Sequence, residues 1–274
     1  MAAALGLLIG LVLGGLGGGG SILAVPALVY LLDQSAQQAT TTSLVIVGLA
    51  AAVAALGHAR SRNTRWRYGA LLALAGVPAS LLGTRLNRLA DGDVVLLAFS
   101  GLMLLAATGM ISRAPQRQAA PTPRPSLPSQ TAGTATITAE RTAGKTRPAR
   151  RTWLRVLVAG LGIGALTGFF GVGGGFIIVP VLVVVLGFPM PVAVGTSLLV
   201  IALNSAVALG ARSSAGLDLD PSVVVPFTAT AVAASLVGKK IADRLPATTL
   251  TRAFGVMLVL IAVYVAVQAV LGLT

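Results

Sequence analysis

The chain has 274 residues, of which 55% are hydrophobic and only 10% are charged. Soluble domains carry about 25% charged residues, so a soluble fold is excluded. The formal charge of +13 lies mainly in two segments, 58–67 and 113–152, as is typical of the cytoplasmic loops of membrane proteins. The composition therefore predicts an all-α polytopic membrane protein that contacts the lipid bilayer, and it argues against a nucleic-acid-binding protein.

Five hydrophobic segments are expected in the first part of the chain, at about 2–16, 21–32, 36–57, 68–88 and 93–112. A membrane-spanning helix needs about 20 residues, and the first two segments are short for that purpose. A glycine cluster, Gly17–Ser21, lies between these two segments. Short apolar segments that meet at a glycine-rich break favour a helical hairpin that dips into the membrane. Two short, tilted spans are the alternative.

The next segment, 113–152, is rich in Pro, Thr and Arg and differs sharply from the rest of the chain. Such a stretch cannot bury enough apolar surface to offset the entropy lost on ordering. We therefore expect a flexible, basic linker in the cytoplasm. It separates a first transmembrane repeat, 1–112, from a second, 153–274.

The second part of the chain shows five more hydrophobic segments, at about 153–169, 175–187, 190–211, 222–243 and 249–272. Three motifs of the first part recur here in the same order. Residues 17–21 with Pro26 match residues 171–175 with Pro180, and 42–44 match 196–198, both at an offset of 154. Residues 79–83 match 234–238 with the offset moved by one. These ordered matches indicate an internal repeat.

The distribution of charge predicts how the repeats are oriented. The two basic segments and Lys239-Lys240 all fall in the cytoplasm if the first two segments of each half enter and leave on the same side. Asp218, Asp220 and both chain termini then lie outside. Each half crosses the membrane an odd number of times, so the second half is upside down. We expect two inverted-topology repeats, each a short glycine-broken helical pair plus three transmembrane helices.

The glycine breaks are the first candidate for a binding site. Non-helical backbone survives in a membrane only where it is buried in protein or faces a wet cavity. A helix that starts there presents free N–H groups and the positive end of its dipole, which suit an anion. The candidate substrate-binding residues are Gly18, Gly19, Gly20, Ser21, Gly173, Gly174 and Gly175. The alternative is that these glycines only permit close helix packing.

Hydroxyl side chains at the start of each third segment are the second candidate. Thr41, Thr42 and Ser43 in the first half correspond to a Thr-Ser pair, Thr196 and Ser197, in the second. Such hydroxyls cap helices or donate to a ligand. Asn204 lies in an otherwise apolar segment, where it hydrogen-bonds between helices or contacts substrate.

Several kinds of chemistry lack the necessary residues. The chain has no cysteine, one histidine and seven acids, and all of the acids fall in expected loops or at helix ends. Thiolate chemistry is excluded, and a proton relay through buried acids is disfavoured. We therefore expect a protein that is not an enzyme and that uses no metal ion or cofactor. His58 lies in a basic segment and is expected to be solvated.

The motifs at 17–26, 41–44, 171–180 and 194–198 resemble those of the TauE/SafE family, also called sulfite exporters or the TSUP permeases. The resemblance covers both hydrophobic halves. It implies a multi-pass permease of a prokaryotic inner membrane, which acts as a secondary transporter of sulfite, sulfonates or other small sulfur-containing anions. The basic linker is longer than in a typical member.

Taken with the residues, this resemblance predicts a secondary transporter that exports a small anion by alternating access between the two repeats. A passive anion channel on the same fold is one alternative. A membrane scaffold that recruits an acidic partner through the basic linker, without transport, is another. A homo-oligomer is also compatible with the sequence.

Overall fold

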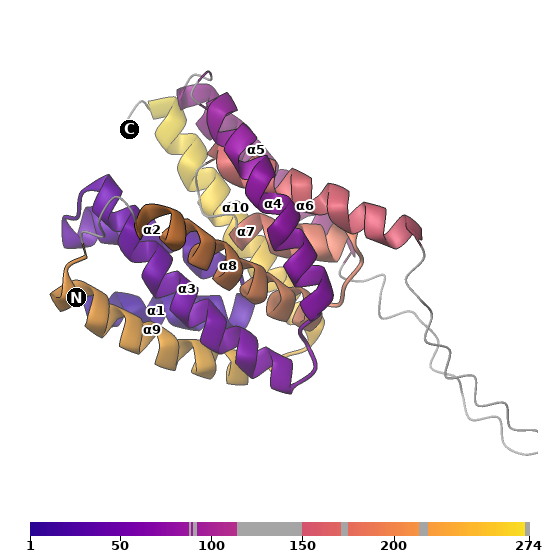
Figure 1. The fold of residues 1–274 in the computed structure, drawn as a ribbon, viewed down its shortest axis with the longest axis horizontal. Helices are drawn as coiled ribbons and strands as arrows, with labels where there is room; N and C mark the ends of the chain where they lie inside the picture. Colours follow the sequence, from indigo (N-terminus) through magenta and orange to yellow (C-terminus); the bar gives the residue numbers. More distant parts are fainter. Residues whose placement is uncertain (88, 90–91, 114–149, 171–174, 214–218, 272–274) are drawn as a thin grey trace, which may run out of the picture.

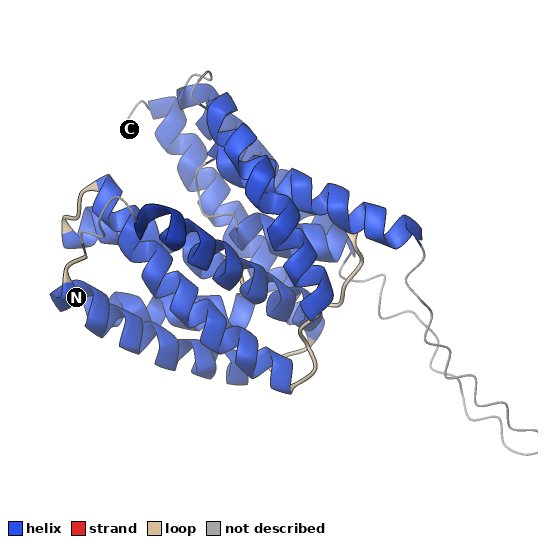
Figure 2. Ribbon diagram, viewed as in Figure 1, coloured by secondary structure: helices blue, strands red, loops and turns tan. Residues whose placement is uncertain are grey.

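The computed structural model describes residues 1–87, 89, 92–113, 150–170, 175–213 and 219–271, and every regular element in these ranges is a helix (Figure 2). The first half contains α1 (Ala2–Leu16), α2 (Gly19–Leu32), α3 (Ala36–Arg60), α4 (Trp66–Asn87) and α5 (Gly92–Arg113). The second half contains α6 (Arg150–Phe170), α7 (Gly175–Pro180) with a π-helical continuation η1 (Val181–Val185), α8 (Met190–Ser213), α9 (Pro221–Ala242) and α10 (Ala247–Leu271). The predicted all-α architecture is confirmed.

Six of the described helices, α3, α4, α6, α8, α9 and α10, are long and apolar enough to cross a membrane. α1, α2 and the helical segment Gly175–Val185 are shorter, as the sequence predicts. α6 differs from the expectation of a short first segment, because it begins at Arg150 and reaches 21 residues. The expected linker lies outside the described residues except for its ends, which belong to α5 and α6.

Local sequence explains where several helices begin and end. Ser35 caps α3 by accepting a hydrogen bond from the Gln38 amide at 3.3 Å, and Asp220 caps α9 by accepting from the Ser222 amide at 2.9 Å. Pro221, the first residue of α9, needs no amide hydrogen there. α1 ends at Gly17, whose φ of 83° lies in the left-handed region that glycine adopts without strain.

The first helix of each half packs on a helix of the other half. Gly6, Gly10 and Gly14 place the backbone of α1 directly against Phe227, Ala231 and Ser235 of α9. In the same way, glycines at 160, 164 and 168 place α6 against residues 72, 76 and 80 of α4. A methyl group on Gly10 or Gly164 would overlap the facing carbonyl group. Small residues at every fourth position are how membrane helices achieve such close approach.

Two long apolar helices, α3 and α8, run antiparallel through the centre. Arg212 at the end of α8 donates from Nη1 to Thr41 Oγ1 near the start of α3, at 2.8 Å. Gly48 contacts Ser205 midway along both helices. His58 near the end of α3 contacts Gly195 near the start of α8. The N-terminus and the end of α10 lie on the left of Figure 1, whereas α6 begins at the opposite end.

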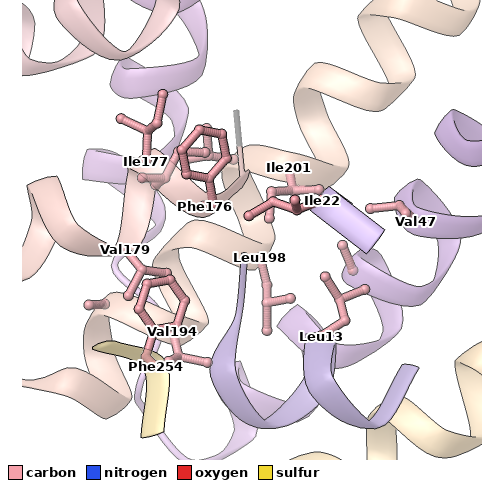
Figure 3. Close-up of a cluster of buried hydrophobic side chains, with 14 of the residues drawn as sticks. Leu13, Ile22, Val47, Phe176, Ile177, Val179, Val194, Leu198, Ile201 and Phe254 are labelled. Carbon is pink, nitrogen blue, oxygen red and sulfur yellow. The ribbon is translucent and has the colours of Figure 1, made fainter. Parts of the chain in front are cut away.

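A hydrophobic core joins the halves around α7, every residue of which is buried. Ile22 of α2 lies near Ile201 and Phe176 in this core (Figure 3). Large apolar side chains also cover the outside of the bundle. Leu74, Leu105 and Leu260, for example, are 72%, 70% and 66% exposed, which suits a surface that faces lipid rather than water.

Candidate functional site

The glycine breaks of the two halves meet. Gly18, which precedes α2, packs on Gly175, which begins α7, so closely that a methyl group on Gly18 would overlap the Gly175 carbonyl oxygen. The neighbouring Gly17 lies against Ser197, and Gly175 lies against Ile201, the twelfth of the 24 residues of α8. The starts of α2 and α7 are therefore in contact beside the middle of a long apolar helix. Gly173 and Gly174 lie outside the described residues.

The other two glycines of the first motif serve packing. A methyl group on Gly19 would lie 2.8 Å from the Met257 sulfur of α10, and one on Gly20 would lie 2.6 Å from the Ile9 carbonyl oxygen of α1. Gly19 and Gly20 are both buried. These two positions thus match the alternative interpretation of the cluster, in which glycine permits close contact between helices.

A cavity of about 520 Å³ lies next to the glycine contact, between α2, α3, α5, α8 and α10. Two predicted residues line it, Ser21 and Ser43. Thr40, Ser205 and Tyr264 add three more hydroxyl groups, and the other lining residues are apolar. Among the described residues that line the cavity, none is charged. A solute here would meet hydroxyl groups and hydrocarbon.

The predicted hydroxyl groups are almost all hydrogen-bonded. Ser21, Ser43 and Ser197 each donate to the carbonyl group three residues earlier, at 2.7, 2.9 and 2.8 Å. Thr41 donates to Gln37 and accepts from Arg212. A serine that donates to its own helix must rotate its hydroxyl before it can donate to an anion. In the described structure, the protons of these serine hydroxyls are directed at carbonyl groups of their own helices.

Thr42 and Thr196 occupy matching positions but differ in their contacts. The Thr196 hydroxyl accepts a hydrogen bond from the Arg65 amide at 3.2 Å. The Thr42 hydroxyl is fully buried and has no partner among the described residues. Asn204, on α8, likewise has a buried Oδ1 without a partner in the described part of the chain. None of these three side chains lines the cavity.

The sequence analysis missed two residues next to this site. The expectation that His58 is solvated is wrong: its side chain is only 2% exposed, and Nε2 lies 3.2 Å from the Gly14 carbonyl oxygen of α1. The helix α3 continues through the basic segment to Arg60, which turns His58 onto α1. Arg212 was assigned to a loop, but it ends α8 and contacts Thr41. Residues 58 and 212 are 154 positions apart, which is the offset of the repeat. This correspondence was the sequence signal that could have identified the two residues as a matching pair.

Comparison with known proteins identifies the family and the relatives of this chain. The model of a family described as sulfite exporter TauE/SafE matches residues 2–265. A probable membrane transporter protein of Xylella fastidiosa (strain Temecula1) is 32% identical over 262 residues, which are 94% of this chain and 91% of the relative. The probable membrane transporter protein YunE of Bacillus subtilis (strain 168) is 27% identical over 209 residues, 73% of each chain.

No solved structure matches the chain significantly. The family match covers nearly the whole chain, and the relatives that span it are named as membrane transporters. Together with the six long apolar helices, this identifies a multi-pass membrane transporter. The chain belongs to the sulfite exporter TauE/SafE family.

Proposed function

We propose that the protein is a secondary transporter that exports a small anion, such as sulfite, a sulfonate or another sulfur-containing organic acid, by alternating access between two inverted repeats. The contact between Gly18 and Gly175 carries this proposal, because it brings together one helix start from each half beside the middle of α8. The free amide groups and the positive dipole ends of these two helices then bind one anion.

The packing of equivalent helices supports the inverted repeats. α3 and α8 match in sequence, yet they run in opposite directions. The pairs α1–α9 and α4–α6 use glycines at matching positions of the two halves. Exchanging the halves converts one pair into the other, as is expected when two inverted copies form one transporter.

The orientation across the membrane is also part of the proposal. Lys239 Nζ lies 3.0 Å from Ser61 Oγ, so two basic regions of the sequence share one end of the bundle. Basic residues are concentrated in cytoplasmic loops. We therefore place this end and the linker in the cytoplasm of a prokaryotic cell, with both chain termini on the outer face of the inner membrane.

The lining chemistry is suited to release as well as to binding. A buried arginine would hold an anion firmly and would cost several kcal/mol when the site is empty. Hydroxyl groups and helix starts bind more weakly and leave no fixed charge behind. The apolar wall of the cavity adds room for the carbon part of a sulfonate.

Flux measurements on the full-length protein in lipid vesicles test the proposal. Radiolabelled sulfite and methanesulfonate should cross protein-containing vesicles faster than empty ones, and a secondary transporter should accumulate the anion against its gradient when a coupling gradient is imposed. Flux that only follows the anion gradient would indicate the channel instead. Absence of flux above empty vesicles, across a panel of sulfur oxyanions and carboxylates, would contradict transport of these anions.

Deleting residues 114–150 separates the transporter from the scaffold. Transport should largely survive this deletion, because neither the glycine contact nor the cavity includes linker residues. A scaffold that recruits a partner through the linker would lose its function.

A further inference from the structure

His58 holds a junction of three elements at one end of the bundle. Because a carbonyl group only accepts, the bond to Gly14 fixes the proton on Nε2 of the neutral ring. The Cβ of His58 lies against Gly195 of α8, and the His58 carbonyl accepts from the Asn63 amide at 3.0 Å. Thr64, in the same loop, also lies against Gly195. His58 thus contacts the last turn of α1 through its imidazole, just before the glycine break, and the start of α8 through its Cβ.

The other ring nitrogen has no partner. Nδ1 of His58 is buried and makes no hydrogen bond with the described residues. α1 carries no charged side chain, and the sole charged residue of α8, Arg212, lies at its far end. The charged groups that act on the imidazole are Lys239, in the last turn of α9, and Asp243, just after it. They pair with each other, and Arg60 lies on the same helix turn as His58.

Protonation would therefore disturb this junction. A proton on Nδ1 creates a buried donor without an acceptor and a positive charge close to Lys239. The unpaired donor and the positive charge each cost free energy when water is excluded. The negative charge of Asp243 offsets this cost only in part. Water entering between α1, α3 and α8 would supply the missing acceptor.

The equivalent junction at the other end of the bundle is built differently. There Arg212 joins the end of α8 to Thr41 of α3, and an arginine keeps its charge at every physiological pH. Of the two matching positions, 58 and 212, only the first carries an imidazole, which gains a charge when it binds a proton.

We propose that His58 is the proton-binding residue of the transporter, and that its protonation opens the junction between α1, α3 and α8 at the end of the bundle where α3 ends. The inference rests on the proposed alternating access. It assigns the proton as the ion that shifts the equilibrium between the two states of the transporter. The opposite junction, at Arg212, stays insensitive to pH.

Cysteine labelling tests this proposal without any transport assay, since the chain has no cysteine of its own. Thr64→Cys places a single thiol at the junction, where Thr64 is 8% exposed. The purified full-length protein is labelled with a maleimide at pH 7.5 and pH 5.5. Each rate is divided by that of Thr249→Cys, an exposed position in α10, to remove the intrinsic pH dependence of the thiol.

The normalised rate should rise at least about tenfold at the lower pH, because a proton-linked equilibrium shifts by up to about tenfold per pH unit and the two conditions differ by two units. The second variant, Thr64→Cys with His58→Gln, keeps an N–H donor for Gly14 but cannot be protonated, and its rate should stay low at both pH values. Equal normalised rates for Thr64→Cys alone would overturn the proposal, as would the same rise in the His58→Gln variant. Neither result depends on whether sulfite or methanesulfonate is transported.

Discussion

α2 and α7 follow the matching glycine clusters of the two halves, yet they lie in different surroundings. α2 lines the cavity with Ser21, Val25 and Pro26, and Pro26 is exposed. α7 is buried along its whole length, including Val179, the match of Val25. The same sequence pattern thus faces open space in one half and packed core in the other. Alternating access requires this difference, because the second state arises when the two copies exchange surroundings.

The largest effect is expected where α2 and α7 touch. Gly18→Ala adds a methyl group that overlaps the Gly175 carbonyl, and backbone cannot move aside as a side chain can. Overpacking of this kind costs about 1–3 kcal/mol, and we expect transport to fall to near the level of empty vesicles. Anion flux and the thermal unfolding midpoint measure the two effects.

Gly162→Ala in α6 is the matched control, because nothing lies within 4 Å of the added methyl group. It should leave both the flux and the unfolding midpoint unchanged. Equal loss in the two variants would mean that the contact between the glycine breaks has no special importance.

The difference in surroundings can be measured with single cysteines at matched positions. Val25→Cys should react with a maleimide at least about tenfold faster than Val179→Cys, because a fully buried thiol reacts only after local opening. Methanesulfonate is a sulfonate that does not react with the maleimide. It should reduce the ratio of the two labelling rates if its binding drives the exchange between the two states of the transporter. Equal labelling rates of the two variants without methanesulfonate would contradict the difference in surroundings between α2 and α7.

A smaller effect is expected from two matched serines. Ser43 lines the cavity, whereas Ser197 is fully buried against Val194 and Gly17. Loss of one hydroxyl contact to an anion is worth about 1 kcal/mol, so Ser43→Ala should raise the KM for sulfite roughly fivefold at nearly constant kcat. Ser197→Ala should instead lower the unfolding midpoint and leave KM unchanged. The reverse pattern would assign the substrate to the second half.

Much of the fold was predictable because it depends on local patterns in the sequence. The apolar runs locate the helices, and the ordered motifs at an offset of 154 identify the two halves. Gly18 and Gly175 belong to the matching glycine clusters, although their contact depends on how the two halves pack. The hydroxyl groups that line the cavity were predicted only in part, because Ser205 and Tyr264 carry no motif.

Other features depend on how distant helices meet. The bond between Arg212 and Thr41 joins residues 171 positions apart, and its formation depends on the crossing of α3 and α8. The burial of His58 depends on one extra helical turn and on the approach of α1. Local composition suggested a solvated basic segment at His58, and the expected apolar segment 190–211 stopped before Arg212; only packing reversed these interpretations.

The glycine face of α1 has a consequence for how the protein is made. Its partner, α9, begins at Pro221, about two hundred residues later in the chain. At roughly 5–20 residues per second, a ribosome needs ten seconds or more to supply it. During that interval, the glycine face of α1 cannot pack against α9. Neither half is therefore a folding unit, and the final assembly must wait until translation is nearly complete.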